Sequence, residues 1–325
     1  MNRGINASRH RYNPLDDFLT VWEGTEINLP LSPAQSYDFR YSVDDSEFIC
    51  STENTLLSIT GLSSGQHTLR IRSMNGVGFP SIRFNNGAYS NDIISILQWG
   101  KSLWGSLAFG FYGCSNLTIN TLDYPILQNC FNTESFFRNC VLVNPDTAFW
   151  DVSNVTDMNN CFRGASIANP NVTDWNVSNV FDMADCFRNC TMANPIVTGW
   201  DVSNVTNISG MFRDCINANI NVTDWNTLSI TDCRNAFRNC ILSDLDLSQW
   251  DVSALLFASN ILTDSGLTTS NLDSLYQSWS VQTLNSGVVF SASPTKYTSG
   301  GSAEASRLVL TSSFNNWVIT DGGGT

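Results

Sequence analysis

The 325-residue sequence lacks most of the signatures by which enzymes, metalloproteins and membrane proteins are recognised. It has only two histidines, His10 and His67, and neither has a metal-ligand or catalytic companion in a known motif. Phosphate-binding loops and nucleophile elbows are missing, and no apolar run approaches the roughly 18 residues needed to span a bilayer. We therefore expect no catalytic residues, no cofactor, no metal ligands and no membrane insertion.

Charge is also scarce, and it is mostly of one sign. Only 14% of the residues are charged, the formal net charge is -13, and the isoelectric point is about 4.4. An acidic surface repels nucleic acid, so we expect no nucleic-acid partner. Abundant Asn, Ser and Thr indicate a neutral-polar surface, which is common in extracellular and virion proteins.

The N-terminal segment has no apolar stretch that could act as a secretory signal. We therefore expect the chain to be made and folded in a cytoplasm. The first 17 residues carry no core pattern, and they form either a frayed terminus or an arm that becomes ordered on a partner. The residues of this candidate docking arm are Arg3, Arg9, His10 and Arg11.

The sequence does contain a repeat of 25 residues. The stretch WDVSNVTDMNNCFRGA at residues 150–165 returns as WNVSNVFDMADCFRNC at residues 175–190 and as WDVSNVTNISGMFRDC at residues 200–215. FYGC at residues 111–114 marks a degenerate copy ahead of them. Two columns recur at this spacing: Trp150, Trp175, Trp200, Trp225 and Trp250, and Phe137-Arg138, Phe162-Arg163, Phe187-Arg188, Phe212-Arg213 and Phe237-Arg238. Five copies in register indicate a repeat architecture.

A 25-residue period lies in the range of leucine-rich repeats, whose coils stack into a solenoid. We therefore predict a β-rich repeat solenoid, leucine-rich-repeat-like, with short strands in segments such as NPNVTDWNVSNV. The DMADCFRNC type of segment is expected to form one or two helical turns that start near Asp182. An Asx column is expected to satisfy the backbone at tight bends. Its members are Asp151, Asn176, Asp201, Asn226 and Asp251.

Nine of the ten cysteines occupy repeat columns in which neighbouring copies carry Ala, Met, Ile or Val. One such column reads Cys140, Ala165 and Cys190 in successive copies. A disulfide or a metal site would need cysteines matched to each other instead of to alanine. The interchange therefore predicts free thiols that pack as small buried hydrophobes. Free thiols also favour folding in a reducing compartment.

The flanks of the array do not repeat. Residues 18–84 contain six short β-rich runs, FLTVW, TEINLPL, YDFRYSV, EFICS, LLSIT and HTLRIRS, which predict an antiparallel β-sandwich. Residues 269–282 show apolar residues at helical spacing behind a Ser270/Asn271 cap. A strand VVF, a second helix at about residues 302–312 and a strand WVIT are expected to follow. This α/β unit would cover the last coil and block edge-to-edge growth.

WDVSNVTDMNNCFRGA, together with AFRNC and FYGCSNLTI, resembles the BspA-like leucine-rich repeats of bacterial surface proteins. FPSIRFNNG followed by IISILQWG is similar to that family's link between a PKD-like β-domain and the repeats, and the C-terminal segment is similar to its cap. After the arm at residues 1–17, the resemblance implies a PKD-like β-sandwich at 18–84, a linker and N-terminal solenoid cap at 85–107, about six solenoid coils at 108–260 and an α/β C-terminal cap at 261–325.

Members of this family are surface adhesins, lipoproteins and phage tail or fibre proteins. Because no signal sequence is visible, the resemblance implies a non-enzymatic phage virion-surface protein: a tail fibre, a tail-tip adhesin or a capsid decoration. Its expected partners are other virion structural proteins and a host receptor or glycan, and homo-oligomers stay open. A bacterial cell-surface adhesin is the alternative, followed by a glycan-active enzyme that uses a carboxylate pair.

The candidate binding site is the regular arginine row of the repeats. The competing interpretation is that these arginines simply pair with stacked aspartates. Weak calcium binding by the Asx column is a further possibility that the sequence leaves open. The row consists of Arg138, Arg163, Arg188, Arg213 and Arg238.

Overall fold

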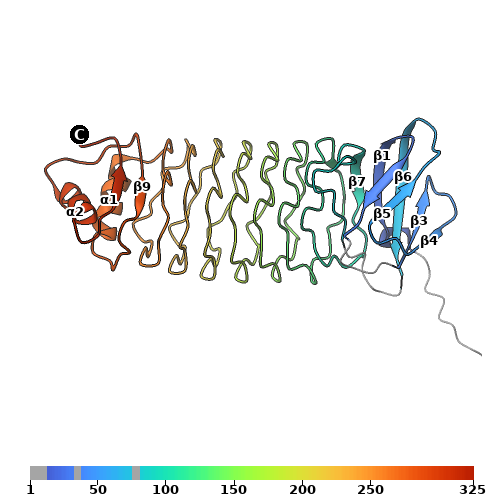
Figure 1. Cartoon of the computed structure of the whole chain (residues 1–325), viewed down its shortest axis with the longest axis horizontal. Coiled ribbons are helices and arrows are strands. Elements are labelled where there is room, and N and C mark those ends of the chain that lie inside the picture. The colour runs from blue at the N-terminus through green and yellow to red at the C-terminus, as the bar shows by residue number, and fades with distance from the viewer. Residues whose placement is uncertain (1–12, 33–37, 75–80) are drawn as a thin grey trace, which may run out of the picture.

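The computed structural model describes residues 13–32, 38–74 and 81–325. Figure 1 shows an elongated molecule with strands at one end, a row of stacked coils in the middle and a small unit with two helices at the other end. The predicted docking residues Arg3, Arg9, His10 and Arg11 lie outside the described residues.

The strand-rich end contains the six strands expected before residue 84. They follow a short 3-10 turn, η1 (Pro14–Asp16), and are β1 (Phe18–Gly24), β2 (Ile27–Pro30), β3 (Phe39–Val43), β4 (Ile49–Ser51), β5 (Leu56–Ile59) and β6 (Gly65–Ser73). Phe18, Thr20 and Trp22 of β1 are fully buried, as period-two alternation predicts. β1 pairs antiparallel with β6, while β2 and β5 form a separate antiparallel ribbon.

Strand β7 (Ile93–Gln98) joins this sheet to the repeats. It pairs antiparallel with β1 and parallel with β8 (Thr118–Ile119), which gives the sheet the order β4-β3-β6-β1-β7-β8. Beyond β8, parallel bridges connect residues 25 positions apart, for example Asp157 with Asp182 and Asp182 with Asn207. We call residues 126–264, in which consecutive coils lie side by side in Figure 1, the repeat stack.

The prediction of a β-rich, leucine-rich-repeat-like solenoid is wrong. Across the described residues the fold is a mixture of small sheets with two helices, and no closed or solenoid sheet runs through the repeats. Neighbouring coils are joined by isolated bridges near Asp182 and its equivalents, and the NPNVTDWNVSNV segment at residues 169–180 forms no strand. The physical reason is frequent turning: the amides of Trp175, Val180 and Cys186 each donate to the carbonyl three residues earlier. Too few residues stay extended between such turns to form a strand.

The helical turns predicted for the DMADCFRNC segment are not formed either. Asp182 does accept a hydrogen bond from the amide of Ala184 at 2.8 Å, but Asp185 and Asn189 have φ values of 53° and 61°. A right-handed helix cannot continue through left-handed residues. The equivalent positions in the other coils are also left-handed, and Asn, Asp or Gly occupies nearly all of them.

The core of the repeat stack consists of aromatic and aliphatic columns. The rings of Phe162, Phe187 and Phe212 stack almost parallel at 5.8 and 5.7 Å between centroids. Each tryptophan from Trp175 to Trp250 also donates its indole N–H to the carbonyl 28 residues earlier; the distance from Trp200 to Val172 is 3.0 Å. Buried residues form one continuous core from the sheet to the C-terminal unit.

The C-terminal unit has the predicted order of elements: α1 (Thr269–Trp279), β9 (Val289–Ser291), α2 (Ser302–Thr311) and β10 (Val318–Thr320). The cap of α1 differs from the prediction, since the side chain of Thr268 accepts from the amide of Asn271 at 3.3 Å. Trp279 donates its indole N–H to the Leu247 carbonyl at 3.0 Å, as the repeat tryptophans do. Helix α1 therefore seats on the last coil by the contact that joins the coils.

Candidate functional site

The five arginines predicted as a binding row stand in register on successive coils. The residue after each of the first four donates its amide to the next arginine's carbonyl, for example Gly164 to Arg188 at 2.8 Å and Asn189 to Arg213 at 2.9 Å. Parallel pairing places neighbouring chains about 4.8 Å apart. The repeat stack therefore carries one guanidinium at roughly that interval along its axis. We call these five side chains the arginine row.

Asp185 lies between two members of the arginine row. Its Oδ2 is 3.0 Å from an amino nitrogen of Arg163 and 3.3 Å from one of Arg188. Gly210 in the next coil makes room for this carboxylate, because a Cβ at Gly210 would lie 2.1 Å from Asp185 Oδ1. The shared aspartate orients two guanidinium groups but balances only one of their two charges.

The remaining members of the arginine row have fewer acidic partners. Arg213 Nε lies 3.3 Å from Asp214 Oδ2, at ion-pair distance but without hydrogen-bond geometry. Arg138 lies over the ring of Tyr112, with 4.7 Å from the guanidinium carbon to the ring centroid. Within the described residues, Arg238 forms no ion pair closer than 4.0 Å. Pairing with aspartate therefore accounts for Arg163, Arg188 and Arg213 and leaves two arginines unexplained.

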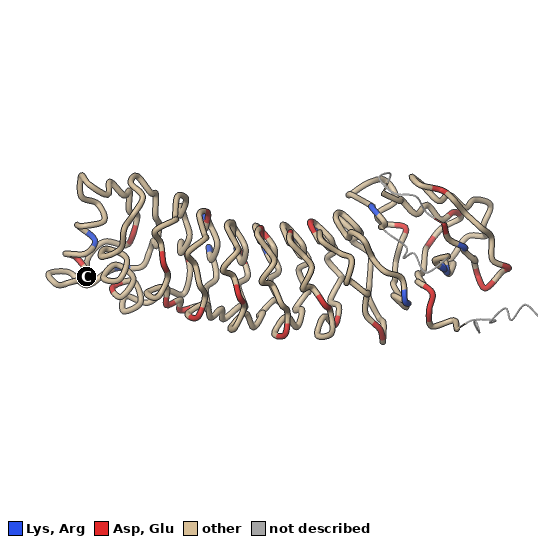
Figure 2. Tube along the Cα trace, turned by 90° about the horizontal axis from the view of Figure 1, so that it is seen from below, with Lys and Arg blue, Asp and Glu red and all other residues tan. Residues whose placement is uncertain are grey.

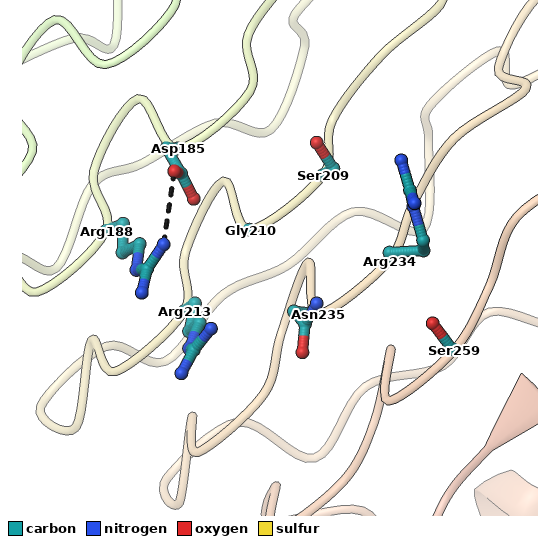
Figure 3. Close-up of a pocket in the computed structure, with 8 residues that line it drawn as sticks. All are labelled: Asp185, Arg188, Ser209, Gly210, Arg213, Arg234, Asn235 and Ser259. Atoms are coloured by element: carbon teal, nitrogen blue, oxygen red, sulfur yellow. Dashed lines mark hydrogen bonds and ion pairs between the residues drawn. The ribbon is translucent and has the colours of Figure 1, made fainter.

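An open hollow of about 350 Å³ lies beside two members of the arginine row, Arg188 and Arg213. Figure 3 shows its lining, which comes from four consecutive coils. Short side chains such as Ser209 and Ser259 leave the space, while Arg188 and Arg213 border it. The full lining is Asp185, Arg188, Ser209, Gly210, Arg213, Arg234, Asn235 and Ser259.

Arg234, Ser209, Asn235 and Ser259 were not predicted as site residues. Arg234 adds a sixth guanidinium to this face, although both oxygens of Asp232 bind it and its guanidinium also lies over the Phe257 ring. Its column carries a different residue type in almost every coil, so the repeat gave no signal for it. The one signal in the sequence is position: Arg234 lies four residues before Arg238 and therefore on the same side of its coil.

The cysteines are free, and nine of them are buried, as predicted. Sequence reasoning missed that several are also hydrogen-bond donors. Cys190 Sγ donates to the Phe162 carbonyl at 2.9 Å, and Cys215 Sγ donates to the Phe187 carbonyl at 3.0 Å. Burial raises the pKa of Cys130 to about 11 and that of Cys161 to about 12. These thiols stay protonated at neutral pH, which makes them poor nucleophiles and poor metal ligands.

The Asx column acts on the backbone as predicted. Asp151 Oδ1 accepts from the amide of Ser153 at 3.1 Å and from its hydroxyl at 2.6 Å, and Asn176 does the same for Ser178. Among residues 13–32, 38–74 and 81–325, no three His, Cys, Asp or Glu side chains are grouped so that they could hold a metal ion. In the same residues, neither helix has the length and apolar character of a membrane span.

Comparison with known families gives one match. A family model described as "Mycoplasma protein of unknown function, DUF285" matches residues 105–197, 131–250 and 182–296. The overlapping matches together cover residues 105–296, which is more than half of the chain. Their starting points lie 26 and 51 residues apart (131 minus 105 and 182 minus 131), close to multiples of the repeat. No curated protein and no solved structure matches this chain.

Proposed function

We propose, from the premise that this chain belongs to the DUF285 family of proteins of unknown function, that it is a non-enzymatic attachment protein. In this proposal the repeat stack is a rigid support, and the arginine row binds an anionic group on the surface of a target cell. The resemblance of the repeats to those of surface adhesins supports the same assignment.

The observation that carries the proposal is the distribution of positive charge. Between residues 102 and 295 every Lys or Arg belongs to the arginine row or is Arg234, so all cations of the repeat stack lie on one face. Acidic residues instead recur from coil to coil along the molecule (Figure 2). In a chain with a net charge of -13, the repeat stack thus gathers all its cations on one face. Such a face attracts an anion that the rest of the surface repels.

Arginine is also the side chain best suited to this task. Its planar guanidinium offers five N–H donors in a fixed fork that matches the two oxygens of a carboxylate or sulfate. The Nε atoms of Arg138 and Arg188 have no hydrogen-bond partner among the described residues. These Nε atoms are enclosed by the protein, so a ligand would be bound by the terminal amino nitrogens of the guanidinium groups.

The location of the protein divides the proposal into two forms. As a virion-surface protein, such as a tail fibre, tail-tip adhesin or capsid decoration, it would attach a phage to its host. As a bacterial cell-surface adhesin, it would attach one cell to another surface, and the family's description as a Mycoplasma protein favours this form. Mass spectrometry of purified virus particles and of surface-biotinylated cells distinguishes the two.

Binding to intact target cells tests the attachment function itself. The purified full chain is labelled with a fluorophore and compared with a variant in which all five residues of the arginine row are replaced by Gln. We expect the variant to lose most of the bound signal while its thermal unfolding stays cooperative. Equal binding by both proteins would exclude the arginine row as an attachment site.

A further inference from the structure

The arginine row differs from every acidic column of the repeat stack. Acidic columns are interrupted by neutral residues: the Asx column reads Asp, Asn, Asp, Asn, Asp from residue 151 to 251. The column whose members form the isolated parallel bridges between coils reads Asn132, Asp157, Asp182, Asn207 and Asp232. Interruption by Asn limits repulsion, because like charges directly opposite each other on paired chains are destabilising. The arginine row has no such interruption in five consecutive coils.

Repulsion within the arginine row is visible in its electrostatics. Burial lowers the pKa of Arg163 from its usual value, the charge of Asp185 opposes this effect, and the positive charges of Arg188 and Arg138 add smaller lowering contributions. Uninterrupted stacking of cations therefore has a cost in all five coils, whereas the acidic columns limit it to the single facing pair Asp157 and Asp182. Costs of this kind are typical of sites that a ligand completes.

Acidic neighbours are too few to explain the arginine row as a structural ladder. The two left-handed columns that flank the arginines offer ten positions, and aspartate occupies only two of them, Asp185 and Asp214. The other eight are Ser, Asn or Gly: Ser135, Asn160, Gly210, Asn235, Asn139, Gly164, Asn189 and Asn239. A ladder built for internal pairing would place a carboxylate beside each arginine.

The geometry points to a linear acidic polysaccharide as the ligand, lying along the axis of the repeat stack with those carboxylates that face the protein paired to arginines of the row. This inference rests on the proposed attachment function and names its ligand class. Five arginines at intervals of about 4.8 Å span about 19 Å. An extended chain of uronate sugars carries one carboxylate per ring, and because successive rings turn about the chain axis, every second or third carboxylate faces the same side.

The neutral groups of the hollow fit the same ligand. Ser209, Asn235 and Ser259 line it beside Arg188 and Arg213, and their side chains can exchange hydrogen bonds with sugar hydroxyls. The hollow is open and crosses four coils, so a polymer can lie through it and continue in both directions. A compact anion such as inorganic phosphate would use only one or two of the arginines.

Biolayer interferometry on the immobilised full chain tests this assignment. The probes are galacturonate oligomers of increasing length, polygalacturonate, neutral dextran, dextran sulfate and poly-glutamate. We expect no binding of dextran, and binding of galacturonates that strengthens with length until the oligomer spans the arginine row, then levels off. Affinity should fall as salt rises, because these charges are only partly buried.

The variant Arg188→Gln/Arg213→Gln should weaken polygalacturonate binding about tenfold or more, since each lost charge-assisted hydrogen bond contributes more than 1 kcal/mol. Arg188→Lys/Arg213→Lys keeps the charge but loses the fork, and should recover only part of the affinity. The matched control is Arg40→Gln/Lys296→Gln, which changes the net charge equally at two exposed sites outside the repeat stack. We expect the control to bind like the wild type.

Several outcomes would overturn the assignment. Affinity independent of oligomer length would indicate a single anion site, and equal weakening by the control would indicate net charge alone. Stronger binding of poly-glutamate would indicate an acidic peptide, and stronger binding of dextran sulfate would indicate a sulfated in place of a carboxylated chain. If polygalacturonate fails while cell binding still depends on the arginine row, the ligand class is wrong and the attachment function stands. If cell binding does not depend on the arginine row, the attachment function fails as well.

Discussion

The strand-rich end and the repeat stack both bury a continuous apolar core, but they do so in different ways. In the six-stranded sheet the separation of partners changes along each pair: Phe18 meets Ile71, 53 positions away, and Gly24 meets Gly65, 41 positions away. In the repeat stack the bridged partners stay 25 positions apart. Each coil therefore contacts little beyond the coils before and after it. The comparison teaches that stability in the stack is a sum of neighbouring interfaces, whereas the sheet is one cooperative unit.

Replacing one buried tryptophan in each region should give the clearest test of this difference in cooperativity. Trp200→Ala loses a stacked ring and its bond to the Val172 carbonyl, and Trp22→Ala loses a fully buried ring of the sheet. Each should cost about 3–5 kcal/mol. By hydrogen exchange we expect Trp200→Ala to expose amides in neighbouring coils only, and Trp22→Ala to expose all strands of the sheet together. If Trp200→Ala also increased amide exchange in the six-stranded sheet, the two regions would not unfold independently.

The column that contains Cys140, Ala165 and Cys190 tests whether the interfaces between coils contribute additively to the free energy of unfolding. Cys190→Ala removes the bond to the Phe162 carbonyl and should cost about 1 kcal/mol. Ala165 occupies the same column one coil earlier, and Ala165→Cys should gain a similar bond to the Phe137 carbonyl. Chemical denaturation under reducing conditions measures both changes. If Cys190→Ala leaves the free energy of unfolding unchanged, the thiols are only space-filling.

Replacing one member of a carboxylate pair in the repeat stack should raise the free energy of unfolding slightly, whereas the substitutions above lower it. Asp157 and Asp182 face each other across two coils, and burial, with a further contribution from Asp182, raises the pKa of Asp157. Ionisation of Asp157 therefore opposes folding, so its contribution to stability becomes less favourable as the pH rises through its raised pKa. Asp157→Asn should stabilise the protein by about 0.2–1 kcal/mol at neutral pH. This gain should vanish in acid, where Asp157 is protonated.

Asp201→Asn is the control for this substitution. Hydrogen bonds from Ser203 lower the pKa of Asp201, so its ionised form favours folding. We expect no gain in the free energy of unfolding at neutral pH. A gain equal to that of Asp157→Asn would show that general charge reduction, and not the facing pair, is responsible.

The smallest effect should be a pH dependence confined to the sheet. His67 places Nδ1 2.7 Å from Asp44 Oδ2 and Nε2 2.8 Å from the Ser63 carbonyl, and the bond to Asp44 raises the pKa of His67. The stabilisation is fully present below the ordinary histidine pKa of about 6.5 and is lost as the pH rises through the raised value. His67→Gln should flatten this dependence in thermal unfolding. An unchanged slope would assign the dependence to other groups.

Much of the fold could be predicted from regular spacing. The Trp and Phe columns, the buried thiols and the two helices of the C-terminal unit were correct because each depends on burial with a clear period. The β-rich solenoid and the helical turns were wrong because no backbone role was predicted for the Asn, Asp and Gly columns that flank the arginines. Asp185 and Asn189 instead adopt left-handed conformations that break both strands and helices.

The arginine row could be predicted as a candidate site, but its surroundings could not. Spacing shows that Arg188 and Arg213 stand in one column, yet it does not show that Asp185 is shared between Arg163 and Arg188. Arg234 and Ser209 belong to a column that varies from coil to coil, so no repeat marks them. Their contribution depends on which side chains are short enough to leave a hollow.

The contact of Trp279 with the last coil has a consequence for how the length of such proteins can change in evolution. Because helix α1 docks by the indole contact that the tryptophans from Trp175 to Trp250 make, we expect it to fit any coil of the same pattern. A gene that gains or loses one whole 25-residue segment therefore leaves both ends of the protein fitted to what they touch. The distance between them becomes an adjustable length, set by copy number instead of by new sequence.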